Sequence, residues 1–142
     1  HSFWYDEAYV ANIVARGSYW GLLTGADRDN GNPPLFWLVA KAWAALFGTS
    51  EAAFRGFPAV VGTLAIPATA ALGRRLGGPA AGVLAGWLVA LNPFALEMSS
   101  ETRVYALLHL LAAVNCLLFL RWLESRRWAD GLLYAAGLAV SF

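Results

Sequence analysis

Long apolar runs separated by short polar segments dominate this chain from residue 57 onward. A helix needs about 20 apolar residues to cross a hydrocarbon core of about 30 Å. Three runs approach or reach that length, at 57–76, 79–96 and 104–123, and another begins at 128–142. The pattern predicts an all-α, polytopic bundle of transmembrane helices over residues 57–142, with about three complete crossings and one truncated crossing.

The pattern of apolar and polar residues in 1–56 is different and predicts shorter helices. Within 6–16, four apolar residues recur at helical spacing: Tyr9, Val10, Ile13 and Val14. Gly17 and Ser18 then end the pattern. This spacing is typical of an amphipathic helix. Residues 25–34 are polar and rich in turn formers, and they predict a loop.

The run at 33–47 allows two interpretations. As a helix it is only about 22 Å long, and Lys41 lies near its middle. A lysine at the membrane centre is costly, whereas Trp37, Lys41 and Trp43 suit the membrane interface. We therefore favour a helix lying parallel to the membrane surface, with a crossing helix as the alternative. On the favoured interpretation, residues 1–56 form an external loop with two membrane-parallel helices.

Composition supports a membrane protein. The chain has 142 residues, of which 59% are hydrophobic and 13% charged, and its mean hydropathy is +0.54. This is too apolar for an ordinary soluble domain, and a net charge of +1 gives no basis for nucleic-acid binding. Cys116 has no second cysteine with which to form an intrachain disulfide. Because the chain starts at His1 and ends within an apolar run, we expect a fragment of a larger membrane domain.

Arginines predict the orientation of the helices. Arg74 and Arg75 follow the first clear run, and three more surround the end of the third: Arg121, Arg126 and Arg127. By the positive-inside rule both segments are cytoplasmic. The segment 97–103 and the residues before 57 then lie on the outer face. If 33–47 does not cross, the acidic pair Asp6-Glu7 shares that face.

The acidic pair is the first candidate for chemistry. Asp6 and Glu7 open the amphipathic segment, where acids also serve as helix caps and favour the helix dipole. On the outer face, however, a carboxylate could act as a general base toward an acceptor. Both explanations fit the sequence.

A second group of candidates surrounds the start of the third run. Glu97 and Glu101 lie one helical turn apart, and Arg103 and Tyr105 follow. An ion pair within an external loop would explain the charges, but an arginine at the outer mouth of a helix is also a good bidentate ligand for phosphate. Arg103 is the first candidate for a lipid-phosphate contact, and Arg55, at the outer end of the first run, is the second.

Other features favour simpler explanations. Residues 27–32 resemble a calcium loop, but Gly31 replaces a ligand and no closing Glu follows, so a solvated loop is expected. We expect His109 to form a hydrogen bond between helices, and Gly82 and Gly86 to allow close helix packing. Pro67 should kink the first run, and Asn92-Pro93 should loosen the end of the second.

The order of several short motifs carries a resemblance to a known family. In chain order they are Asp6-Glu7, Asn32-Pro33-Pro34-Leu35, Phe54-Arg55, Arg74-Arg75-Leu76-Gly77-Gly78, Asn92-Pro93-Phe94 and Arg103-Val104-Tyr105. Taken together, the chain resembles the N-terminal part of the polyprenyl-phosphate-sugar-dependent membrane glycosyltransferases of the GT-C fold. That group includes the protein O-mannosyltransferases and the lipid A aminoarabinose transferases.

The resemblance implies an activity and a site. It implies transfer of a sugar from a polyprenyl-phosphate donor to a lipid, glycan or protein acceptor at the outer face of a bacterial inner membrane. Asp6, with Glu7 beside it, would act at the acceptor by deprotonating it, and single displacement would invert the anomeric centre. Arg103 and less firmly Arg55 would bind the lipid phosphate, with Tyr105 and Glu101 beside the donor.

The resemblance also has gaps. The family's first transmembrane helix and its later spans are absent from this chain, which we therefore expect to be inactive alone. Some members bind a divalent metal ion beside the acidic residue. This chain shows no convincing histidine ligand near Asp6, since His1 is its first residue, and metal use is left open. The competing classes are a transporter or flippase whose outer-face carboxylates bind a cation, and a purely structural membrane subunit. Ionisable residues at the ends of the runs, away from the midplane, weigh against a transporter.

Overall fold

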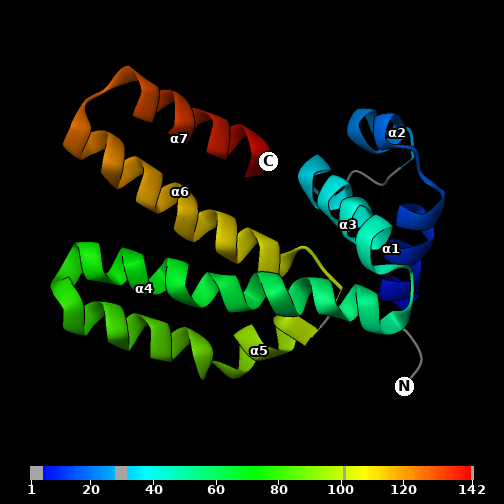
Figure 1. The fold of residues 1–142 in the computed structure, drawn as a ribbon, viewed down its shortest axis with the longest axis horizontal. Coiled ribbons are helices and arrows are strands. Elements are labelled where there is room, and N and C mark those ends of the chain that lie inside the picture. Colours follow the sequence, from blue (N-terminus) through cyan, green and yellow to red (C-terminus); the bar gives the residue numbers. More distant parts are fainter. Residues whose placement is uncertain (1–4, 28–31, 101, 142) are drawn as a thin grey trace.

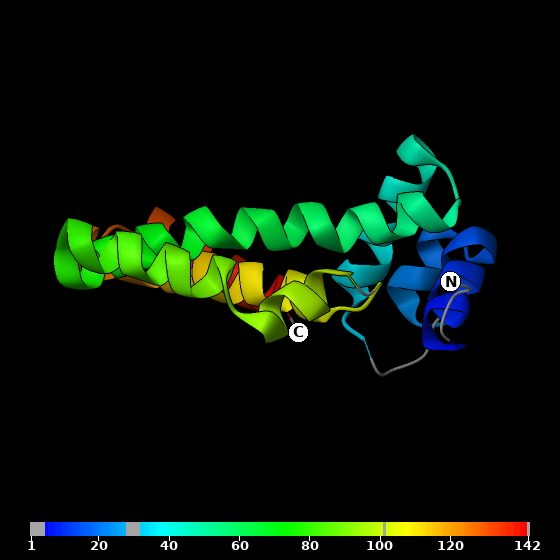
Figure 2. The same ribbon diagram turned by 90° about the horizontal axis from the view of Figure 1, so that it is seen from below.

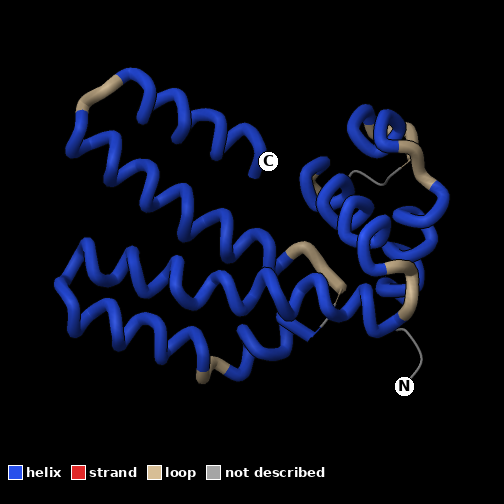
Figure 3. The backbone as a smooth tube through the Cα atoms, viewed as in Figure 1, coloured by secondary structure: helices blue, strands red, loops and turns tan. Residues whose placement is uncertain are grey.

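A computed structural model describes residues 5–27, 32–100 and 102–141, leaving aside the side chains of residues 5–7 and 140. These residues form seven helices and no strand (Figures 1 and 3), so the all-α prediction is confirmed for the described part of the chain. Two helices, α4 (Glu51–Ala90) and α6 (Tyr105–Ser125), are long and apolar enough to cross a membrane.

Helix α4 is a hairpin of two limbs. Its backbone leaves the helical region at Gly78, where φ is 82° and ψ is −175°. Such a positive φ favours glycine, and Pro79 then suits the first turn of the second limb. Figure 1 shows the two limbs, in green, running antiparallel from this turn. The predicted break between 57–76 and 79–96 is therefore confirmed, while the backbone stays helical through Pro67.

Small residues hold the two limbs together. A Cβ atom added at Gly82 would lie 2.8 Å from the carbonyl oxygen of Ala70 and 2.8 Å from Cβ of Arg74. One added at Gly86 would lie 3.2 Å from Cβ of Ala70. The limbs are too close at these positions for larger side chains, as the glycine spacing predicted.

Helices α5 (Pro93–Ser100), α6 and α7 (Trp128–Ser141) complete the bundle. Asn92 interrupts the second apolar run as predicted, because its side-chain oxygen accepts hydrogen bonds from the backbone N–H of Phe94 at 2.9 Å and of Ala95 at 3.4 Å. Helix α7 packs against α6, where buried Asn115 donates a hydrogen bond to the Ser141 hydroxyl at 2.8 Å.

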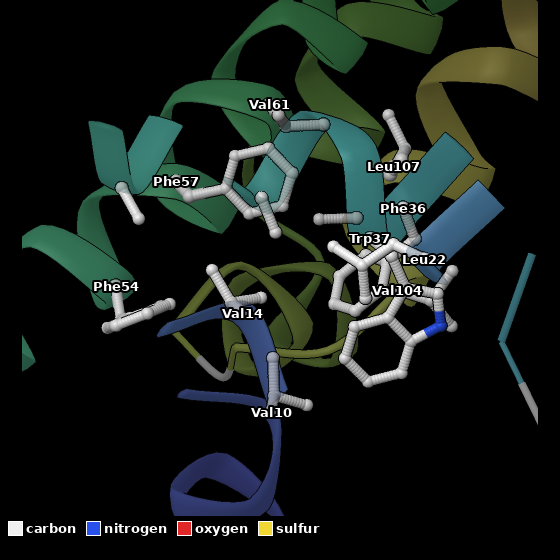
Figure 4. Packing of buried hydrophobic residues seen from close by; sticks show 13 residues of the cluster. Val10, Val14, Leu22, Phe36, Trp37, Phe54, Phe57, Val61, Val104 and Leu107 are labelled. Atoms are coloured by element: carbon white, nitrogen blue, oxygen red, sulfur yellow. The ribbon is translucent and has the colours of Figure 1, made fainter. Parts of the chain in front are cut away.

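Three short helices cover one end of the bundle (Figures 1 and 2): α1 (Tyr5–Arg16), α2 (Tyr19–Thr24) and α3 (Pro34–Phe47). Figure 4 shows their shared core, in which Val10 and Val14 of α1 meet the aromatic residues of α3 and α4. Phe36 and Trp37 are fully buried there and form an edge-to-face pair with ring centroids 5.3 Å apart. Burial of such large apolar side chains fixes the short helices to the start of α4 and α6.

Polar contacts reinforce this packing. The Lys41 ammonium donates a hydrogen bond to the carbonyl oxygen of Val14 at 2.9 Å, one of the carbonyls that the end of α1 leaves without a helical partner. The indole N–H of Trp43 donates to the carbonyl oxygen of Ala53 in α4 at 2.8 Å. Lys41 therefore has a structural partner in α1, which the interfacial interpretation of residues 33–47 did not anticipate.

Most of the turns and connections lie toward the two ends of the molecule (Figure 1). Figures 1 and 2 place the turn of α4 and the α6–α7 connection at one end, and α1–α3 together with the connection between α5 and α6 at the other. The candidate residues Arg55, Arg103 and Tyr105 belong to the second end, and the arginine-rich turns belong to the first.

Candidate active site

A cavity of about 630 Å³ lies between the first limb of α4, helix α5 and the start of α6. Its lining combines polar and apolar groups. Arg55, Ser100 and Tyr105 contribute polar groups, whereas Ile66 and Val89 contribute apolar ones. Because Arg55 and Ile66 both line it, the cavity extends about 16 Å along α4. It could hold a molecule with a charged head and an apolar tail.

The path of α5 forms this cavity. The break at Asn92 turns the chain, and α5 then packs against α4. A side chain at Gly62 would collide with the Ser99 hydroxyl of α5, so the missing Cβ atom permits the close approach. The sequence signals for this arrangement were the Asn92-Pro93 pair and an isolated glycine within an apolar run.

His109 lies on the wall of the cavity. One of its ring nitrogens is 3.4 Å from the Thr69 hydroxyl of α4, so the predicted hydrogen bond between helices is confirmed. The sequence did not predict the cavity that His109 also lines.

A smaller cavity of about 210 Å³ adjoins the first. Tyr9 and Val10 of α1, Phe36 of α3, and Arg103 and Tyr105 line it. Tyr105, with 47% of its surface exposed, lines both cavities. The structure thus brings Arg103 and Tyr105 together on one cavity and places Arg55 on the neighbouring one.

The two candidate phosphate ligands differ in their surroundings. Arg55 is partly exposed and its guanidinium is 3.1 Å from the Glu51 carboxylate, one helical turn earlier. Arg103 is half-buried beside the fully buried Thr102. Glu51 was not among the predicted site residues, although its i, i+4 spacing to Arg55 is the signal that could have found it.

The predicted acidic residues are described only in part. Asp6 and Glu7 belong to the first turn of α1, but their side chains lie outside the described residues, and so does the whole of Glu101. Position 6 precedes Tyr9 and Val10 by one helical turn, and residues at this spacing share a helix face. Position 6 therefore belongs to the face of α1 that lines the smaller cavity.

Asp27, the first residue of the predicted solvated loop at 27–32, has a structural role. Its carboxylate accepts hydrogen bonds from the backbone N–H of Ser18 at 2.8 Å and from the Ser18 hydroxyl at 2.9 Å. These bonds, together with the charge of Lys41, lower the pKa of Asp27. Residues 28–31 of that loop lie outside the described residues.

No group of three or more His, Cys, Asp or Glu side chains that could hold a metal ion occurs among the described residues. The arrangement near Tyr105 instead offers two guanidinium groups, a phenol and a long, partly apolar cavity. Guanidinium groups suit a phosphate, and the cavity beside them suits an apolar chain.

Two helices are long and apolar enough to cross a membrane, and the larger cavity beside the first of them is lined by both polar and apolar groups. A scan against protein families matches residues 31–142 to the family described as dolichyl-phosphate-mannose-protein mannosyltransferase. The chain belongs to this family of membrane glycosyltransferases. No curated protein and no solved structure matches it.

The match confirms the resemblance found in the sequence. It covers the whole lining of the larger cavity and that of the smaller cavity except for Tyr9 and Val10, since α1 and α2 precede residue 31. The acidic pair therefore lies outside the matched residues.

Proposed function

We propose that this chain carries the donor-binding part of a glycosyltransferase that moves a sugar from a polyprenyl phosphate to an acceptor, inverting the anomeric centre. The observation that carries the proposal is the pair of adjoining cavities that share Tyr105. One is long and apolar with Arg55 at its polar part, and the other joins Arg103 to the face of α1 that bears position 6.

In this proposal the larger cavity takes the first part of the polyprenyl chain. The phosphate lies near Tyr105, where Arg103 provides a positive charge and hydrogen bonds that bind the donor. Arg55 contributes a second positive charge, and Glu51 holds its guanidinium in place. Tyr105 can donate a hydrogen bond to the phosphate or to the sugar from between the two cavities.

The acceptor enters from the side of α1. Asp6 removes the proton from its hydroxyl or amine as that group attacks the anomeric carbon, and the bond from that carbon to the phosphate oxygen breaks. We also propose that Glu7 adds a second negative charge beside Asp6 and that Glu101 takes part in binding the donor. The protein crosses a bacterial inner membrane several times and performs this transfer at the outer face.

The test uses the full-length protein in membranes, a radiolabelled polyprenyl-phosphate sugar and measurement of label transferred to acceptor. Asp6→Asn should reduce kcat by at least about 100-fold, because general-base catalysis contributes about 10²–10⁴-fold. Arg103→Gln should chiefly raise KM for the donor. Glu97→Gln is the matched control, since Glu97 is an exposed carboxylate on α5 that lines neither cavity.

Full activity of Asp6→Asn would refute the assignment of the base. Unchanged donor KM in Arg103→Gln would refute the phosphate site. If substitution of either residue instead altered uptake of a solute, with no sugar transferred by the wild type, the transporter alternative would replace the proposal.

A further inference from the structure

Five arginines occupy the end of the molecule opposite the candidate active site. We call this surface the arginine end: Arg74, Arg75, Arg121, Arg126 and Arg127. The first two precede the turn of α4, and the other three surround the α6–α7 connection. Figures 1 and 2 show both segments at the same end of the bundle.

Two of these arginines have carboxylate partners. Arg75 lies 3.3 Å from Glu124, and this ion pair joins the turn of α4 to the end of α6. Arg121 lies 2.7 Å from Asp130, which is buried and also accepts a hydrogen bond from the Ser125 hydroxyl at 2.6 Å. These pairs fix the shape of the surface.

The other three have no such partner. Arg74, Arg126 and Arg127 are exposed, and none forms an ion pair with the described residues. The arginine end therefore presents three positive charges that no ion pair with the described residues compensates, beside one exposed ion pair and one with a buried carboxylate. Charges of one sign at this density attract an anionic partner.

Arg126 occupies a backbone conformation that favours glycine. Its φ is 53° and its ψ is 18°, in the left-handed region that follows many helices. Glycine is the usual residue there because it has no Cβ atom to strain the turn. An arginine at this position makes the turn less stable than a glycine would, and it places a guanidinium group at this end of the bundle.

Apolar and aromatic side chains surround the charges. Trp128 follows Arg127 and is 89% exposed, and Leu76 follows Arg75 and is 68% exposed. Exposed tryptophan beside arginine is typical of the level of lipid headgroups. A soluble anion would contact only the arginines, whereas a lipid would contact the arginines with its charged headgroup and the apolar side chains with its acyl chains.

We propose that the arginine end binds the headgroups of anionic phospholipids at the cytoplasmic membrane surface, with Arg74, Arg126 and Arg127 contacting their phosphates. A net negative headgroup is preferred over a zwitterionic one because the latter carries its own positive charge. The site is separate from the proposed glycosyl transfer and does not depend on it.

The experiment measures lipid binding to the full-length protein in detergent micelles by native mass spectrometry, with phosphatidylglycerol and phosphatidylcholine as the competing probes. The wild type should prefer phosphatidylglycerol. An arginine near a membrane surface is worth about 1 kcal/mol toward anionic lipid, or about fivefold in affinity. Each single Arg→Gln change should therefore weaken binding about fivefold, and the triple Arg74→Gln, Arg126→Gln, Arg127→Gln variant about 100-fold.

Arg126→Gly separates lost binding from lost folding. Glycine relieves the left-handed turn, so this variant should unfold at a higher temperature than the wild type in phosphatidylcholine alone while binding phosphatidylglycerol about fivefold more weakly. Arg16→Gln, an exposed arginine at the end of α1, is the matched control and should bind like the wild type.

Equal binding of the two lipids by the wild type would overturn the proposal. So would a triple variant that keeps the wild-type preference, or an Arg16→Gln variant that loses as much as Arg126→Gln. Displacement of phosphatidylglycerol by an equal concentration of glycerol phosphate would also overturn it, because the site would then recognise a free anion.

Discussion

Replacement of Gly82 by alanine should separate the two limbs of α4. The added Cβ atom would lie 2.8 Å from the Ala70 carbonyl oxygen and 3.1 Å from the backbone nitrogen of Arg74, and backbone atoms cannot rotate away. Overpacking of this kind typically costs about 1–3 kcal/mol. We expect Gly82→Ala to lower the free energy of unfolding of the full-length protein by that amount, measured by titration with a denaturing detergent.

Two further glycines calibrate the result. Gly86→Ala should cost less, because its nearest atom is the Ala70 side chain at 3.2 Å. Gly56→Ala is the matched control: its Cβ atom would meet a ring atom of Trp43 at 3.5 Å, an ordinary contact, so the change should be neutral or stabilise by up to about 1 kcal/mol. Equal effects of Gly82→Ala and Gly56→Ala would refute the close packing of the limbs.

Three other substitutions test contacts outside the cavities. Asp27→Asn should destabilise the full-length protein at neutral pH, because hydrogen bonds from Ser18 lower the pKa of Asp27 in the folded state. The stabilisation from ionised Asp27 is present above the unfolded-state pKa and is lost as pH falls through the folded-state pKa. The free energy of unfolding should therefore depend less on pH between about pH 7 and pH 3 in the variant than in the wild type. Lys41→Met should cost about 1–2 kcal/mol and speed hydrogen exchange at the end of α1, because the bond to the Val14 carbonyl is lost; unchanged exchange would contradict this. Asp130→Asn should cost about 1–2 kcal/mol in detergent unfolding, less than a fully buried ion pair because its arginine partner is 58% exposed, and a neutral variant would show that the pair contributes nothing.

Much of the helix pattern could be predicted from the sequence because membrane helices require long apolar runs. The predicted runs correspond to the two limbs of α4 with α5, then α6 and α7. Two breaks have local causes: Gly78 interrupts α4 with a positive φ, which favours glycine, and the Asn92 side chain caps the first turn of α5. The prediction missed α2, a helix of six residues that Ser18 caps.

The site was harder to predict because tertiary contacts create it. The position of Arg103 and Tyr105 beside an apolar run makes them candidates, and both line one cavity. The sequence did not reveal that Tyr105 lines two cavities, that Glu51 pairs with Arg55, or that Lys41 donates a hydrogen bond to the Val14 carbonyl of α1. Each of these depends on how α3, α4 and α5 pack, which hydrophobic periodicity alone does not specify.

We propose that the acidic pair and the candidate phosphate ligands Arg55 and Arg103 lie on one outer face. Single cysteines at positions 6, 97 and 75 of the full-length protein, in a Cys116→Ala background, test this by labelling intact cells with a membrane-impermeant thiol reagent. We predict labelling at 6 and 97 and none at 75. Labelling at 97 without labelling at 6 would place α1 across the membrane from Arg103, and no shared site could then exist.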